Sequence, residues 1–323
     1  MQGGAIRVAR IVAGLAAATL LVACDVPSPV AAPVPAPQPV AAAPVAAAPN
    51  TGPSPASRAL AQYYSRVQAD LLAQGLLRTD GGGPDTPFDA EMVARNFERI
   101  AFFDEYERGG GLARASNRAG ALRRWTGPVR FGVEFGASVP VAQQAPDRQG
   151  VAGYVARLAR ATGHPMTMAS PAGANYNVLI MGEDDRAQMI ARVTELVPNI
   201  DRASLQFLQQ MPRSIHCLVM AFSDPAADQV YTRAIAVIRA EHPDLMRRSC
   251  VHEELAQGLG LANDSPAARP SIFNDDDEFA FLTTQDEVFL RILYDPRLAP
   301  GLPLSTARPI VMQIATERVG GSS

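Results

Sequence analysis

The order of apolar and polar residues predicts a chain in which helices alternate with short strands. Helices are predicted where the apolar residues fit a helical period. These segments are 58–78, 89–106, 150–162, 185–196, 203–211, 227–240 and 244–261. Short apolar runs predict buried strands at 129–135, 178–181 and 216–222. The mixed order predicts an α+β fold with a small mixed sheet.

The first 56 residues differ in composition from the rest of the chain. Two arginines precede the uncharged stretch 11–23, which is shorter than the roughly 20 residues of a membrane-spanning helix. Residues 1–23 are therefore expected to be an export signal rather than an anchor. Residues 24–56 are mostly Ala, Pro and Val, which predicts a disordered tether that favours polyproline II. The folded domain is then expected over residues 57–323.

The export signal ends in Leu21-Val22-Ala23-Cys24, which resembles the lipobox of bacterial lipoproteins. This resemblance implies cleavage before Cys24 and lipidation of its thiol, which would hold the chain on a membrane. Asp25 resembles an inner-membrane retention signal. The expected location is thus the cell envelope, facing the periplasm, at the inner rather than the outer membrane. The alternative is an ordinary signal peptide followed by a chance cysteine.

The chain contains three cysteines, and lipidation of Cys24 leaves Cys217 and Cys250 as a possible pair. An exported protein folds in an oxidising compartment, where such a pair forms a disulfide. The bond would join a predicted strand to the predicted helix 244–261 and stabilise the fold by roughly 3 to 4 kcal/mol. Two buried free thiols are the alternative.

The charge of the chain bears on its partners. Its formal net charge is −3, and charged residues make up 19% of the 323 positions. We find no run of basic residues that would follow a phosphate backbone. The sequence therefore does not predict a nucleic-acid-binding protein.

The segment from Cys250 to Asp264 carries the most informative motif. A zinc helix that started at His252 would need a ligand at position 256, which is Ala256 and has no donor atom. Reading from Glu253 gives Glu-Glu-x-x-Gln-x-x-Gly-x-x-Asn-Asp. This spacing resembles the metzincin zinc-protease pattern His-Glu-x-x-His-x-x-Gly-x-x-His-Asp, with all three histidines replaced.

The metzincin resemblance assigns a role to each position. Glu253, Gln257 and Asn263 stand at the positions of the metal ligands. Glu254 stands at the position of the general base, which polarises a metal-bound water. Gly260 lets the chain turn after the helix. One carboxylate and two neutral amides do not favour zinc, whereas another divalent ion such as calcium or magnesium accepts oxygen ligands.

The resemblance continues downstream of the helix. Pro270-Ser271-Ile272-Phe273 is similar to the turn of matrixin-type metzincins, with Phe273 in place of the methionine of that turn. Segment 282–294 is similar to their final helix. The whole block resembles a family of proteobacterial lipoproteins of unknown function. It implies a zincin-like domain and brings no established activity.

Two hypotheses for function follow from these patterns. The first is a tethered domain that has lost zinc chemistry and binds an envelope protein or peptide. In that case the acidic residues cap or salt-link the helix, and Gln257 and Asn263 bond the following loop. The second is a metal-dependent hydrolase or peptidase that uses Glu254 with an oxygen-ligated ion. His252 is a possible proton carrier, although its side chain points about 100 degrees away from that of Glu253.

Overall fold

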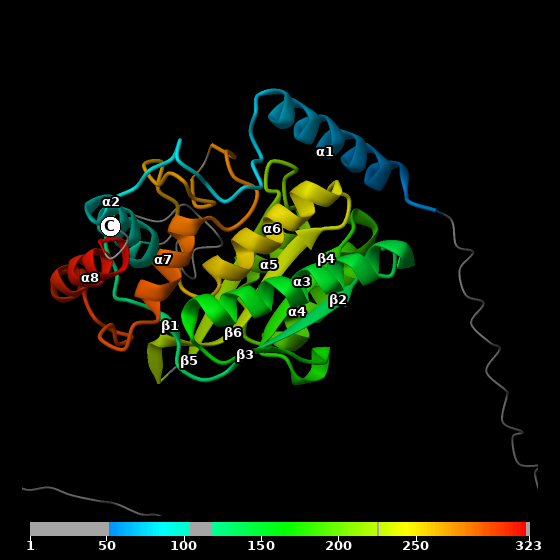
Figure 1. Ribbon diagram of the computed structural model, residues 1–323. Helices are drawn as coiled ribbons and strands as arrows, with labels where there is room; N and C mark the ends of the chain where they lie inside the picture. Colours follow the sequence, from blue (N-terminus) through cyan, green and yellow to red (C-terminus); the bar gives the residue numbers. More distant parts are fainter. Residues whose placement is uncertain (1–51, 104–117, 225, 275, 321–323) are drawn as a thin grey trace, which may run out of the picture. The chain divides into compact units, whose positions relative to one another are not determined.

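A single mixed sheet organises the part of the chain that the structure describes (Figure 1). Its strands are β1 (Arg124–Trp125), β2 (Val129–Phe135), β3 (Met166–Met168), β4 (Tyr176–Met181), β5 (Cys217–Asp224) and β6 (Ala227–Arg239). The strand order is β1-β6-β4-β2-β3, and all of these neighbours are parallel. The exception is β5, which runs antiparallel along β6. The sheet is therefore mostly parallel with one antiparallel edge strand.

This structure is a computed structural model, and it describes residues 52–103, 118–224, 226–274 and 276–320. The predicted export signal, Cys24 and nearly all of the predicted tether lie outside these residues. Within them, no helix is both long and apolar enough to span a membrane.

Helices cover both faces of the sheet. They are α1 (Pro55–Ala73), α2 (Ala90–Phe102), α3 (Val141–Thr162), α4 (Arg186–Leu196), α5 (Arg202–Gln209), α6 (Asp244–Gln257), α7 (Thr284–Leu293) and α8 (Leu304–Val319). Buried residues of α2, α3, α6, α7 and α8 form one core with one face of the sheet. Buried residues of α4 and α5 form a second core with the other face. Two 3₁₀ turns, Pro171–Gly173 and Glu183–Asp185, flank β4.

The alternation of side chains along the central strands creates these two cores. In β4, Val178 and Ile180 enter the first core, whereas Leu179 and Met181 enter the second. Residues i and i+2 of a strand share a face, so a strand covered on both sides reads as one continuous apolar run. Because β4 is buried on both faces, its sequence at 178–181 is a continuous apolar run, and the strand predicted from that run is present.

The helix predicted over 227–240 is wrong, because this segment is strand β6. Residues from Ala234 to Arg239 pair with β4, and almost the whole strand pairs with β5. Its buried end is rich in β-branched residues such as Ile235, Val237 and Ile238, which favour strands. A short apolar run fits both periods, and here the sheet partners decide the structure.

Helix α3 is much longer than predicted, and α8 lies where no helix was predicted. α3 begins at Val141 rather than Gly150 and carries Pro146 in its second turn, a position where the sequence argues for a break. α8 was not predicted, because Pro309 lies inside it and few of its residues mark a buried face. The prediction of mixed helices and strands around a mixed sheet is confirmed.

Candidate functional site

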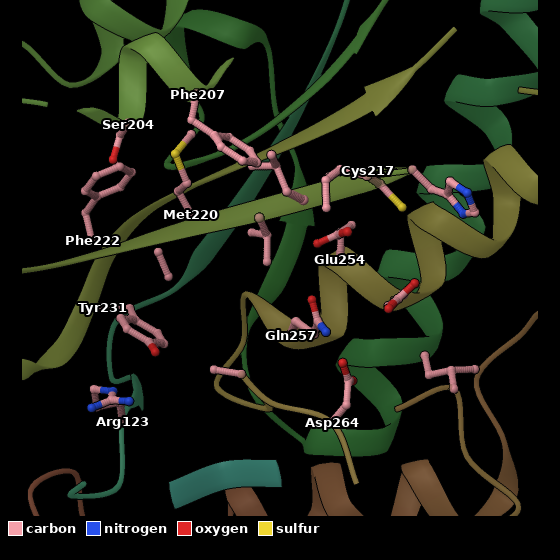
Figure 2. Close-up of a pocket in the computed structure, with 18 of the residues that line it drawn as sticks. Arg123, Ser204, Phe207, Cys217, Met220, Phe222, Tyr231, Glu254, Gln257 and Asp264 are labelled. Carbon is pink, nitrogen blue, oxygen red and sulfur yellow. The ribbon is translucent and has the colours of Figure 1, made fainter. Parts of the chain in front are cut away.

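A cleft of about 800 Å³ runs along the edge strand β5 (Figure 2). Residues of β5 line it throughout, and the far end of α6 forms the opposite wall. Helix α5 and the loop between α6 and α7 contribute the remaining walls. The cleft is thus built from the sheet edge and from the helix that carries the predicted motif.

Strand β5 divides the cleft into two chemically different sides. Met220 and Leu218 belong to the core under α4 and α5, whereas Cys217, Val219 and Ala221 pack towards α6. In Figure 2, Phe207, Met220 and Phe222 gather on one side of the strand, and Glu254, Gln257 and Asp264 gather on the other. One side is apolar, and the other carries carboxylates and amides.

Three aromatic side chains fix the C-terminal end of α6. The Tyr176 hydroxyl donates to the carbonyl oxygen of Glu254 at 2.6 Å. The indole nitrogen of Trp125 donates to the carbonyl of Gly258 at 2.9 Å, and the Tyr294 hydroxyl donates to that of Leu259 at 3.2 Å. Gly258 and Leu259 follow the last residue of α6, so their carbonyls are outside the helical ladder and the two side-chain donors satisfy them. The Glu254 carbonyl accepts from the Gly258 amide at 3.0 Å as well as from Tyr176.

The predicted turn at Gly260 is present. Its φ is +131°, which L-residues with a side chain rarely adopt, and an added β-carbon would collide with the carbonyl oxygen of Arg123. The chain therefore turns sharply after α6 and brings Asp264 back to the cleft.

The structure gathers most of the predicted site residues. Glu253, Glu254 and Gln257 all line the cleft from one end of α6. Asn263 is not among the residues that line it. Its amide nitrogen donates to the carbonyls of Arg99 and Asp264, at 3.1 and 2.9 Å. These hydrogen bonds agree with the first hypothesis, in which Asn263 has a structural role after the helix.

The donor atoms in the cleft do not fit a zinc ion. Among the described residues, the group able to approach one ion consists of Cys217, Glu253 and Glu254, whose ligand atoms lie within 4.8 Å of one another. The sulfur of Cys217 is bonded to Cys250, so it is not a thiolate. Two carboxylates without histidine or thiolate are a poor zinc site. We derive no chemical step through a metal.

The predicted disulfide between Cys217 and Cys250 is present. It joins the start of β5 to α6 one turn before Glu254 and therefore links the two main walls of the cleft. The ring nitrogen Nδ1 of His242 lies 3.7 Å from the Cys250 sulfur. Burial lowers the pKa of His242 well below its ordinary value, so this imidazole is neutral at pH 7.

The segment Pro270 to Phe273, whose Ile272 lines the cleft, is held in place by one buried carboxylate. Asp286 accepts hydrogen bonds from the Ser271 hydroxyl at 2.6 Å and from the Ile272 amide at 3.0 Å. The same carboxylate accepts from the amide of Thr283 and closes the capping box of α7. Phe273 is fully buried in the first core. Asp286 thus ties the turn to the start of the next helix.

His252 does not reach the cleft. Its ring stacks on Tyr154 with 3.9 Å between centroids, and its Nδ1 accepts a hydrogen bond from the Leu282 amide at 3.0 Å. Burial, followed by the charges of Arg157 and Arg248, lowers its pKa to about 3. This histidine is a neutral packing residue at pH 7.

Carboxylates dominate the charge of the cleft. Its lining contains one guanidinium, that of Arg123, and six acidic residues, which are Asp201, Asp228, Glu253, Glu254, Asp264 and Asp277. Burial lowers the pKa of the lining residue His216, so it adds no positive charge at pH 7. Burial also raises the pKa of Tyr176, and the Glu254 carboxylate adds to that shift. The cleft therefore favours a cationic partner.

A family model described as a protein of unknown function (DUF2927) matches residues 90–313, which is more than half of the chain. The chain belongs to the DUF2927 family. The match includes every strand of the sheet and all residues that line the cleft. A comparison with curated proteins found no match. The sequence prediction of a family of unknown function is confirmed at this level.

The cleft of this DUF2927 domain contains residues that the sequence reasoning did not assign. Asp264 is the last residue of the motif and was counted only as part of the pattern. Arg123 and the apolar residues Phe207, Met220 and Phe222 lie outside the motif. The alternation along 216–222 was a usable signal, because it places Met220 and Phe222 on one face.

Proposed function

We propose that this protein is a membrane-tethered, non-catalytic binding module of the bacterial cell envelope. Its cleft would hold an extended segment of an envelope protein or peptide. The observation that carries this proposal is the position of β5, an edge strand that forms the floor of an 800 Å³ cleft.

An exposed strand edge offers backbone groups that pair with an added strand. Among the described strands, β5 pairs only with β6. A peptide laid along β5 would gain main-chain hydrogen bonds from the edge and side-chain contacts from the walls. The cleft has walls on both sides of the strand, so it offers contacts to side chains on both faces of a bound peptide. This arrangement favours a peptide over a small flat ligand.

The domain is further proposed to be zincin-like. The support is the presence of three features around one cleft: the motif on α6, the sharp turn at Gly260, and the buried turn 270–273, whose Ile272 lines the cleft. The replacement of the three histidines and the poor donor set support the loss of zinc chemistry. A peptide-binding cleft without its metal remains able to bind.

The location of the module is proposed from the first 56 residues. A lipid on Cys24 would anchor the chain, and the proline-rich stretch up to residue 56 would separate the domain from the bilayer. The domain would then face the periplasm, at the inner membrane if Asp25 acts in sorting.

Blocking the cleft tests the binding function. The full chain, purified in detergent, is incubated with a library of acetylated and amidated octapeptides, and the retained peptides are sequenced. Ala221→Trp places a large side chain in the cleft, whereas Ala187→Trp adds the same side chain on an exposed position of α4. We expect retention by the wild type and Ala187→Trp and loss in Ala221→Trp. Equal retention by all three would contradict binding along β5.

A second candidate function is hydrolysis with a hard divalent ion. The observation that favours it is the closeness of the Glu253 and Glu254 carboxylates. Elemental mass spectrometry on the full chain, purified without chelators, tests it against a Glu253→Ala, Gln257→Ala variant. Near-stoichiometric metal that is lost in the variant would favour the hydrolase, whereas no metal in either protein favours the binding module.

A further inference from the structure

The two sides of β5 would present different surfaces to a peptide that extends the sheet. On the α6 side lie Glu253, Glu254 and Asp264. These acidic residues outnumber the cations that line the cleft, where Arg123 is the only guanidinium among the described residues. A lysine or arginine side chain is complementary to this side, whereas an acidic side chain is repelled.

The α5 side has the opposite character. Phe207, Met220 and Phe222 line it together with Ile200. Its one carboxylate, Asp201, caps α5 and accepts hydrogen bonds from the Ser204 amide at 2.8 Å and the Ser204 hydroxyl at 2.6 Å. A large apolar side chain is the complementary partner here.

The geometry of a strand connects these two preferences. Successive side chains of an extended peptide point to opposite faces, so positions i and i+2 share a face. Pairing with β5 imposes the same two faces on the peptide. A cation on one face and an apolar group on the other must then be separated by an odd number of positions.

We propose that the cleft selects extended peptides in which a lysine or arginine and a large apolar residue stand one or three positions apart. The cation would lie against Glu253, Glu254 and Asp264, and the apolar residue against Phe207 and Met220. This inference rests on the proposed binding function and adds the chemical class of the ligand. The same charges disfavour an acidic peptide or a nucleic acid as the ligand.

The octapeptide library provides the first test when it is analysed for spacing. We expect enrichment of lysine or arginine together with leucine, phenylalanine or methionine at odd separations. Enriched peptides without a cation, or with the two residues at even separations, would overturn this inference and leave peptide binding intact. A library without any enrichment would overturn the binding function itself.

Two variants test the α6 side and the α5 side of the cleft separately. Glu253→Gln keeps the size of the side chain and removes one charge from the α6 side, and we expect it to weaken a selected cationic peptide about five-fold. The norleucine counterpart of that peptide should bind both proteins equally. Phe207→Ala should remove the apolar preference and keep the cationic one. The matched control is Glu91→Gln, which removes one charge from an exposed position of α2.

The control also guards against a general effect of net charge. If Glu91→Gln weakens the cationic peptide as much as Glu253→Gln does, long-range attraction explains the preference and the assignment of faces is overturned. If Phe207→Ala alters the preference for the cation, the α5 side and the α6 side of the cleft do not act independently. That result would also overturn the assignment of the two preferences to the two sides.

Discussion

The hydroxyl of Tyr176 lies directly against Gly258, so close that a β-carbon on residue 258 would overlap with it. Tyr176 comes from β4 in the middle of the sheet, and Gly258 caps α6. The same hydroxyl donates to the Glu254 carbonyl. This contact sets the distance between the sheet and the helix end that carries Glu254 and Gln257.

Gly258→Ala is therefore expected to destabilise the domain by about 3 kcal/mol, because neither the helix end nor the buried tyrosine has room to move. Gly153→Ala is the matched control: Gly153 lies on the exposed face of α3, and an added β-carbon meets no atom within 4 Å. That variant should gain about 0.5 to 1 kcal/mol. Urea unfolding of the three proteins measures both effects, and equal midpoints would contradict the close contact.

The disulfide should contribute strongly to stability. Cys217 and Cys250 are 33 residues apart in sequence, and closing a loop of that length in the unfolded chain stabilises the fold by about 3 to 4 kcal/mol. We expect the Cys217→Ala, Cys250→Ala variant to unfold at much lower urea concentration than the oxidised wild type. The reduced wild type should behave like the variant. A wild-type midpoint that is insensitive to reductant would show that the bond is absent.

His252 should make the stability depend on pH. Its pKa is about 3 in the folded protein and about 6.5 in an unfolded chain. Between these values the unfolded state binds a proton that the folded state does not, so stability falls as the pH drops below about 6.5. His252→Phe keeps an aromatic ring beside Tyr154 and removes this titration.

Unfolding free energies between pH 7.5 and 5.5 check the effect of His252. The variant should lose less stability over this range than the wild type, although part of the dependence remains because burial also lowers the pKa values of His164, His216 and His242. The same pH dependence in wild type and His252→Phe would contradict the assignment.

Lipidation of Cys24 remains a prediction from the sequence. Cys24→Ser should abolish the incorporation of labelled palmitate and move the protein from the membrane fraction to the soluble fraction. The folded domain should keep its unfolding midpoint, because Cys24 lies outside the described domain. Labelled palmitate that persists in the variant would rule out this cysteine as the lipidated residue.

Helices and strands were predicted well where the apolar residues followed one clear period, either helical or alternating. Val129 to Phe135 alternates clearly, and β2 has the predicted bounds. The segment 227–240 was predicted as a helix because a run buried on two faces carries no distinct period. Strand β4 is distant in sequence and pairs in parallel, whereas β5 directly precedes this segment and pairs antiparallel. Only the assembled sheet shows that the segment pairs with both strands.

The candidate site was predicted only as far as the α6 motif reached. Spacing along one helix was enough to place Glu253, Glu254 and Gln257 together. The hydrogen bonds of Asn263 to the carbonyls of Arg99 and Asp264 depend on how the following loop packs. The alternation along 216–222 places Met220 and Phe222 on one face. That α5 covers this face depends on the assembled fold, which no local pattern encodes.

Mass spectrometry of peptides after incubation with the full chain distinguishes a binding module from a hydrolase most directly. One measurement then reads both retention and cleavage of the octapeptide library. We expect that cationic, partly apolar peptides are retained intact and that none is shortened. Specific cleavage products that disappear in Glu254→Gln would contradict a binding module and establish a hydrolase.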